Sequence, residues 1–173
     1  MPFNLSIRSS KNQVLDHNWP DLESSFNLIF QDPEISQRKN CHESNAWINY
    51  SIVFKSPNKK ISFESKNYLL SLKPLSEINR LKKEIEAFLS SDQKSFSFEP
   101  LEPNLELVLE KSNNGKFKLF CWIDNGNAEL THYTWDSFGL RLYTDKEEIN
   151  KFISQIDELN ELLVMCKASV TFT

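Results

Sequence analysis

The sequence predicts an α+β fold: a mostly antiparallel β-sheet with one inserted helix, at about residues 75–91, and one C-terminal helix, at about 145–166. Two observations support this. Apolar residues alternate along several short segments, which is the period of a half-buried strand. Two other segments repeat apolar residues at three- and four-residue spacing, as amphipathic helices do. Because most of the strands follow one another directly, hairpins and antiparallel pairing are expected.

The composition suits one folded domain covering residues 1–173. Hydrophobic residues make up 39% of the 173 and aromatic residues 12%, which is enough to bury a core without disulfides or metal. Residues 1–45 are expected to form an N-terminal extension with strand-like stretches at 3–7 and 26–30. A third strand is predicted at 46–56, and it forms a hairpin with the segment 59–65.

The inserted helix begins near Pro74, because proline is tolerated in the first turn of a helix. Its apolar stripe consists of Ile78, Leu81, Ile85, Phe88 and Leu89. Phe96 and Phe98 then begin another strand, which ends at two Glu-Pro pairs.

The next hairpin allows a prediction of register. A three-residue loop, Asn113-Asn114-Gly115 with Gly115 left-handed, places Glu110 opposite Lys118. The same register pairs Leu109 with Leu119, and one face of the hairpin is then wholly apolar. Leu107 and Leu105 are paired in the same way with Cys121 and Ile123. A two-residue turn would mix charged and apolar residues on both faces, so the three-residue loop is preferred.

Two further strands are expected, a short one at 129–133 and a clearer one at 138–143 with Leu140 and Leu142 inward. Thr144 and Glu147 have the spacing of a capping box, with threonine as the N-cap of the last helix. The tail at 170–173 is expected to fray or to pair as an edge strand.

Several function classes are excluded by composition. The three glycines lie far apart, so no glycine-rich phosphate loop is predicted. The net charge of −4 disfavours nucleic-acid binding. No apolar run is long enough for a signal peptide or a membrane span, so a cytoplasmic location is expected. The three cysteines show neither disulfide nor zinc-ligand spacing.

No catalytic, cofactor-binding or metal-binding residue is predicted. Glu99 and Glu102 each precede a proline, which favours extended backbone at a strand end over a converging acid–base pair. The histidines, His17, His42 and His132, lie in polar surroundings without a nucleophile motif. Adjacent Cys41 and His42 are not expected to act as a pair, and Cys121 and Cys166 are predicted to be packing residues.

The other face of the 105–123 hairpin carries Glu106, Val108, Glu110, Lys118, Phe120 and Trp122. If it faces solvent, its aromatic residues bordered by acid resemble a protein-binding surface, with Glu106, Glu110, Phe120 and Trp122 as partner-binding residues. If a helix covers it, these residues form a second core layer. Because the two helices must bury apolar stripes, we expect at least part of this face to be covered.

In order, these elements resemble the WapI-type immunity proteins of bacterial polymorphic or contact-dependent toxin systems. The resemblance rests on the Trp47-led strand, the segment from Phe98-Glu99-Pro100 to Leu107, a strand closing on Trp122, and Gly139-Leu140-Arg141-Leu142 before the final helix. It implies a non-enzymatic cytoplasmic protein that binds one cognate toxin, with a basic nuclease as one such toxin. Two alternatives are a ligand-binding or enzymatic domain with a cleft near His132, Tyr133 and Trp135, and an adaptor subunit of a larger complex.

Overall fold

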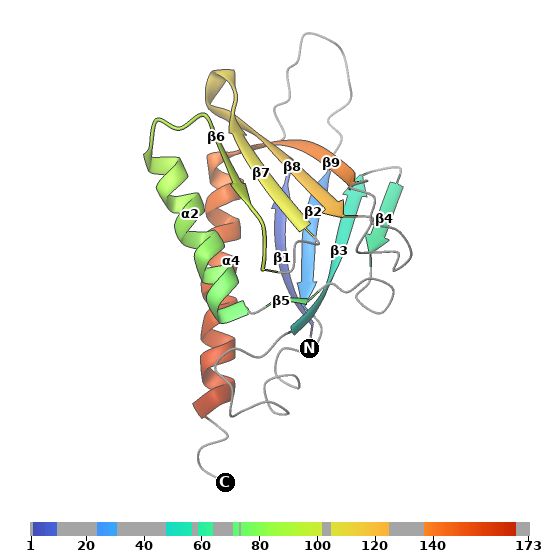
Figure 1. Cartoon of the computed structure of the whole chain (residues 1–173), viewed down its shortest axis with the longest axis vertical. Coiled ribbons are helices and arrows are strands. Elements are labelled where there is room, and N and C mark those ends of the chain that lie inside the picture. The colour runs from blue at the N-terminus through green and yellow to red at the C-terminus, as the bar shows by residue number, and fades with distance from the viewer. Residues whose placement is uncertain are drawn as a thin grey trace.

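The computed structural model describes residues 2–9, 24–30, 48–56, 59–63, 71–72, 74–101, 105–124 and 137–168. Within these residues, two antiparallel β-sheets and two α-helices enclose a hydrophobic core (Figure 1). The predicted α+β class and both predicted helices are confirmed. The strand expected at 129–133 and the tail at 170–173 lie outside the described residues.

The first sheet is built from strands within residues 3–72. Its strands are β1 (Phe3–Arg8), β2 (Ser25–Phe30), β3 (Ile48–Ser56) and β4 (Lys59–Phe63), in that order, with the two-residue β5 (Ser71–Leu72) on β3. In β1 alternate residues, Leu5 and Ile7, are buried, whereas β2 and β3 bury consecutive residues at 26–28 and 50–54. Thus β1 and β2 contribute directly to the core.

The inserted helix begins with a single π-helical turn, η1 (Pro74–Ile78), and continues as α2 (Asn79–Ser90). Leu81, Ile85 and Phe88 are its buried residues, at the predicted spacing. The Phe88 ring lies 5.8 Å from that of Phe96 and 6.2 Å from that of Phe117, measured between centroids. The apolar stripe of α2 is therefore used on the core side of the second sheet.

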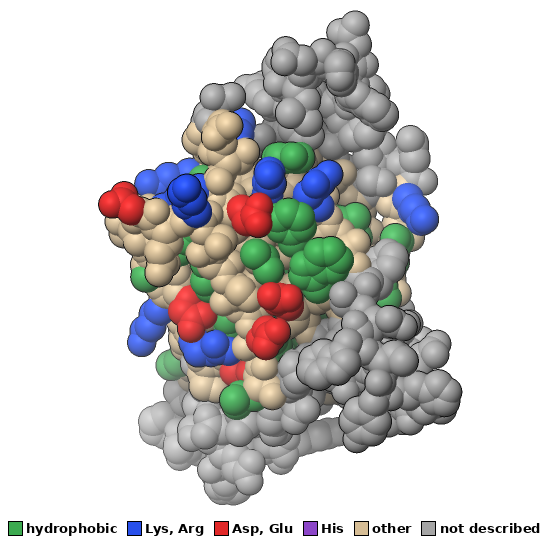
Figure 2. Space-filling model, turned by 45° about the horizontal axis from the view of Figure 1, so that its top comes forward, with side chains coloured by type: hydrophobic (Ala, Val, Ile, Leu, Met, Phe, Trp, Pro, Cys, Tyr) green, Lys and Arg blue, Asp and Glu red, His purple; other side chains and the backbone are tan. Residues whose placement is uncertain are grey.

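The second sheet has the order β6 (Ser95–Phe98), β7 (Leu105–Lys111), β8 (Lys116–Asp124) and β9 (Ser137–Asp145). The predicted register is confirmed: Glu110 pairs with Lys118, and Leu109 with Leu119. The turn contains a short 3₁₀ segment, η2 (Asn113–Gly115), and Gly115 has φ +70°, a conformation that glycine adopts without steric cost. The apolar side of this hairpin faces the core, and the opposite side lies at the surface (Figure 2).

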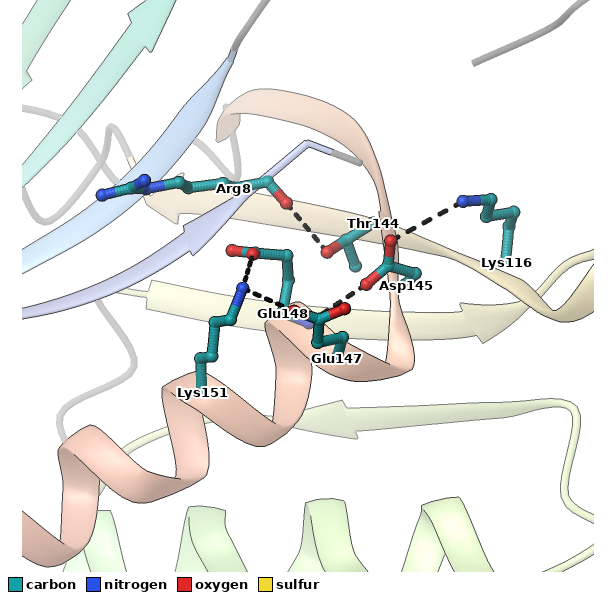
Figure 3. A network of polar contacts seen from close by, with 7 residues as sticks. All are labelled: Arg8, Lys116, Thr144, Asp145, Glu147, Glu148 and Lys151. Carbon is teal, nitrogen blue, oxygen red and sulfur yellow. Dashed lines mark hydrogen bonds and ion pairs between the residues drawn. The ribbon is translucent and has the colours of Figure 1, made fainter. Parts of the chain in front are cut away.

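The last helix, α4 (Lys146–Ala168), follows β9 without a loop, and the predicted cap is wrong by one residue (Figure 3). The hydroxyl of Thr144 is fully buried and donates to the carbonyl of Arg8, at 2.8 Å. The Asp145 carboxylate instead accepts the backbone N–H of Glu148, at 3.1 Å, as an N-cap does. Thr144 cannot act as the cap because β9 still turns its side chain inward there.

Helix α4 lies beside the first sheet and beside α2 (Figure 1). The side chain of Gln155 accepts the backbone N–H of Ser6 at 2.7 Å, so the helix satisfies a donor of the edge strand β1. Lys82 of α2 forms an ion pair with Asp157 of α4, and the Asn160 amide donates to Asn79 at 2.7 Å. In the described part of the chain, no helix is long and apolar enough to cross a bilayer.

Candidate functional site

The surface of the second sheet that points away from the core is the candidate site, called here the outer face. Its residues on β7 and β8 are paired across the hairpin: Glu106 with Trp122, Val108 with Phe120, and Glu110 with Lys118. Strand β9 extends these rows with Gly139 opposite Trp122, Arg141 opposite Phe120 and Tyr143 opposite Lys118. The four predicted partner-binding residues, Glu106, Glu110, Phe120 and Trp122, are therefore brought together on one surface.

Among the described residues, neither helix covers the outer face. Trp122 is 37% exposed, Arg141 is exposed, and the other side chains of these rows are half-buried. The expectation that a helix covers part of this face is wrong, because the buried residues of α2 and α4 join the core on the inner side. Two stacked sheets supply enough inward-facing apolar surface to bury both helical stripes, so none is left for the outer face.

Two aromatic rings form the centre of the outer face. The rings of Phe120 and Trp122 lie 6.3 Å apart between centroids and are nearly parallel, at 7°. The indole of Trp122 covers Gly139, where a Cβ atom would lie only 2.1 Å from Trp122 Cε3. A glycine inside a strand often marks such a close approach. Gly139 therefore sets the position of the Trp122 ring.

Charged side chains of both signs surround this aromatic centre (Figure 2). Glu106 accepts a hydrogen bond from the Ser97 hydroxyl at 2.8 Å, and Glu110 lies 4.0 Å from the Lys118 ammonium. The Arg141 guanidinium lies 5.9 Å from the centre of the Tyr143 ring. With two carboxylates and two cations, the outer face is not acidic as a whole, and it offers polar contacts of both signs.

Two other predicted candidates, Cys121 and Glu99, lie within the described residues. Cys121 is 1% exposed and packs in the core, and burial raises the pKa of its thiol well above the ordinary value, which suppresses nucleophilic reactivity. The Glu99 side chain is exposed at the end of β6. The remaining candidates lie outside the described residues: Glu102, His17, His42, His132, Cys41, Tyr133 and Trp135.

No metal centre is found among the described residues, since none of them form a group of three or more potential ligands. Three members of the outer face were missed by sequence reasoning, namely Gly139, Arg141 and Tyr143. An isolated glycine within the alternating segment at 138–143 was the available signal for Gly139. Arg141 follows two residues later on the same side of β9.

The chain was also compared with known proteins. A family model described as the immunity protein WapI-like family matches residues 23–162. The matched span runs from just before β2 into α4, and it includes every residue of the outer face. Comparison with curated proteins and with solved structures gave no match.

Proposed function

Because the chain belongs to the WapI-like immunity protein family, we propose that it binds a cognate bacterial toxin and neutralises it by direct contact. The observation that supports this proposal most directly is the outer face. It presents a stacked Phe120–Trp122 pair on a paired, rigid sheet. Sheet positions hold side chains more accurately than loop positions, which lowers the entropy lost on binding.

The proposed contact residues are Glu106, Glu110, Phe120 and Trp122. Tryptophan and arginine are enriched among residues that dominate protein–protein binding energy, and such residues are often surrounded by polar ones. Trp122 and its neighbour Arg141 fit that composition, and the two glutamates supply the polar surroundings. We expect the aromatic pair to supply most of the binding energy and the glutamates to supply orientation.

The net charge of −4 supports a basic toxin as partner, and we propose a basic nuclease as the class. An opposite net charge speeds encounter over distances longer than a contact. The outer face itself carries both signs, so the final docked position depends on matched local charges as well as on net attraction.

We further propose that inhibition occurs in the cytoplasm and requires no catalytic step. A protein that occupies or distorts the surface of its toxin needs no reacting group of its own. Cys121, a nucleophilic residue type in the described part of the chain, is buried with a raised thiol pKa and faces away from the outer face. The alternatives of a ligand-binding domain or an adaptor make different predictions in the following experiment.

The test is co-expression with the toxin encoded by the adjacent reading frame. The intact chain is expected to restore growth and to form a stable 1:1 complex in size-exclusion chromatography with light scattering. Trp122→Ala and Phe120→Ala are expected to lose protection, whereas Val164→Ala, at a 57% exposed position on α4, retains it. An intact chain that neither restores growth nor forms a complex contradicts the proposal and leaves the adaptor or ligand-binding alternatives.

A further inference from the structure

Leu101 is the most exposed of the large hydrophobic side chains in the described residues. It is 68% exposed, compared with 57% for Val164 and 37% for Trp122. A single exposed leucine is ordinary on a protein surface. The unusual feature of Leu101 is the way in which its backbone is held.

A buried carboxylate holds the backbone of Leu101. Glu77, in η1, is only 2% exposed, and its Oε1 accepts the Leu101 N–H at 2.5 Å. Burying a carboxylate is costly unless hydrogen bonds compensate for the lost water. The contact therefore fixes the chain beneath an exposed side chain.

Arg80, the second residue of α2, holds the other end of the short segment that leads from β6 to Leu101. Its Nη2 donates to the carbonyl of Glu99, and its guanidinium lies 4.4 Å from the centre of the Phe98 ring. Between the two attachment points Pro100 is buried, and its ring restricts the backbone further. The backbone segment 99–101 is thus attached at both ends to the helical segment formed by η1 and α2.

The alternating exposure of β6 extends past the end of the strand to Leu101. Exposure alternates regularly from Ser97 through Glu99 to Leu101, with Phe98 and Pro100 buried between them. Ser97 belongs to the outer side, because it pairs with Val108 and donates to Glu106. Leu101 lies three residues beyond the end of β6, and Trp122 lies two strands away on β8, so a rise of about 3.3 Å per residue and strand spacings of about 4.8 Å place Leu101 within roughly 25 Å of Trp122. A standard interface of roughly 800 Å² per partner spans both.

We propose that Leu101 is a second anchor for the protein partner of the outer face, entering an apolar pocket bordered by lysine or arginine on that partner. The basic border follows from charge complementarity, because Glu99, two residues before Leu101, is exposed and Glu106 lies opposite Trp122 on the outer face. This inference rests on the proposed function. Its physical basis is preorganisation, since a backbone that is already fixed loses little freedom on binding.

The experiment measures the Kd for the toxin by calorimetry, with the intact chain, Leu101→Ala and Leu101→Asp. Removing a buried leucine side chain from an interface is expected to raise the Kd about tenfold, and an aspartate in an apolar pocket raises it further. The effect of Leu101→Ala is expected to be smaller than that of Trp122→Ala, because leucine is less frequent than tryptophan among dominant interface residues. Val164→Ala and Val164→Asp are the matched controls and leave the Kd unchanged.

The outcomes separate this inference from the proposed function. If both Leu101 variants bind like the intact chain while Trp122→Ala binds weakly, the second anchor is wrong and the proposed function stands. If Val164→Asp weakens binding as much as Leu101→Asp, the effect is not specific to Leu101 and the inference is also wrong. If the intact chain does not bind the toxin at all, the proposed function itself fails.

A second variant tests the presentation of Leu101 by Arg80, whose side chain is 42% exposed. Arg80→Ala is expected to weaken toxin binding in the intact chain, because the Glu99 carbonyl loses its donor. In the Leu101→Ala background the same change has no further effect on the Kd. Additive losses of affinity in the double variant contradict the role of Arg80 as a positioning residue.

Discussion

The two faces of the β7–β8 hairpin belong to the same two strands but differ in burial and in composition. The inner face consists of Leu105, Leu107, Leu109, Leu119, Cys121 and Ile123, each 3% exposed or less. On the outer face all side chains are half-buried or exposed, with aromatic and charged residues side by side. Residues that stabilise the core and residues that we propose to contact the toxin therefore alternate along the same strands.

This separation follows from strand geometry. Successive side chains point to opposite sides, so a slip of one residue would move the entire apolar row to the surface. The inner row therefore fixes the register by itself, because burying each large side chain stabilises the correct register by about 1.5–3 kcal/mol. The outer row is then free to vary without changing the fold, which suits a surface that must match a particular partner.

The largest expected effect is on the inner face. Leu119→Ala is expected to lower the free energy of unfolding by about 2–5 kcal/mol, because it removes a fully buried side chain and leaves a cavity. Phe120→Ala, at the next residue, is the matched control, with a loss of about 1 kcal/mol from the aromatic stack. Urea denaturation measures both values, and equal losses would contradict the division between the faces.

Alkaline pH is expected to destabilise the protein through two buried ionisable groups, Cys121 of the inner face and Tyr50 of β3. Burial raises the pKa of Cys121 well above the ordinary thiol value of 9.0, and it also raises that of Tyr50 above 10.0. In the unfolded chain both groups lose their protons at their ordinary pKa values, whereas the folded state keeps them. Their contribution to the free energy of unfolding is complete below the ordinary pKa values. It falls by about 1.4 kcal/mol per pH unit for each group as the pH rises above those values.

Cys121→Ala isolates the thiol contribution. Between pH 9 and 10, unfolding measurements are expected to show a steeper loss of stability in the intact chain than in the variant. Cys41 and Cys166 are common to both proteins and cancel in the difference. Identical pH slopes would mean that Cys121 ionises in the folded state, and would contradict its burial on the inner face.

The register and burial of the inner face could be predicted from the sequence. For the outer face, the sequence predicts which residues lie on it but not whether other elements cover them. Alternation of apolar residues along both strands, together with the left-handed turn position at Gly115, is sufficient to determine the register. Whether Phe120 and Trp122 were covered depended on where the helices pack. That is a long-range property, because it depends on how the two sheets and the two helices share one core.

Two local features also depended on tertiary context. Thr144 has the usual chemistry of an N-cap, but its hydroxyl is used inside the protein by the carbonyl of Arg8, and the cap moves to Asp145. Leu101 follows a Glu-Pro pair that indicates a strand end. Its attachment to the buried Glu77, from a distant helical turn, has no signal in the local sequence.

A smaller effect is expected from Gly139→Ala on the outer face. The new methyl group would occupy the position of the Trp122 ring, so the indole must turn away, at a cost of about 1 kcal/mol in stability. Toxin binding is expected to weaken because the aromatic pair is no longer stacked. In a Trp122→Ala background the same change should affect neither quantity, since the clash is gone. A loss of binding that persists in that background would show that Gly139 acts by another route.

The smallest expected effect concerns the Glu110–Lys118 pair, at 4.0 Å and with both side chains more than 30% exposed. Glu110→Gln is expected to lower the free energy of unfolding by only about 0.2–1 kcal/mol, because exposed cross-strand ion pairs are weakened by solvent and by salt. Its effect on toxin affinity should be larger than its effect on stability. Lys118→Gln is the control for the pair, and the double variant shows whether the two changes are additive. If Glu110→Gln destabilises the fold by several kcal/mol and leaves binding intact, the outer face is structural at this position, and the division of labour between the two faces of the hairpin does not hold.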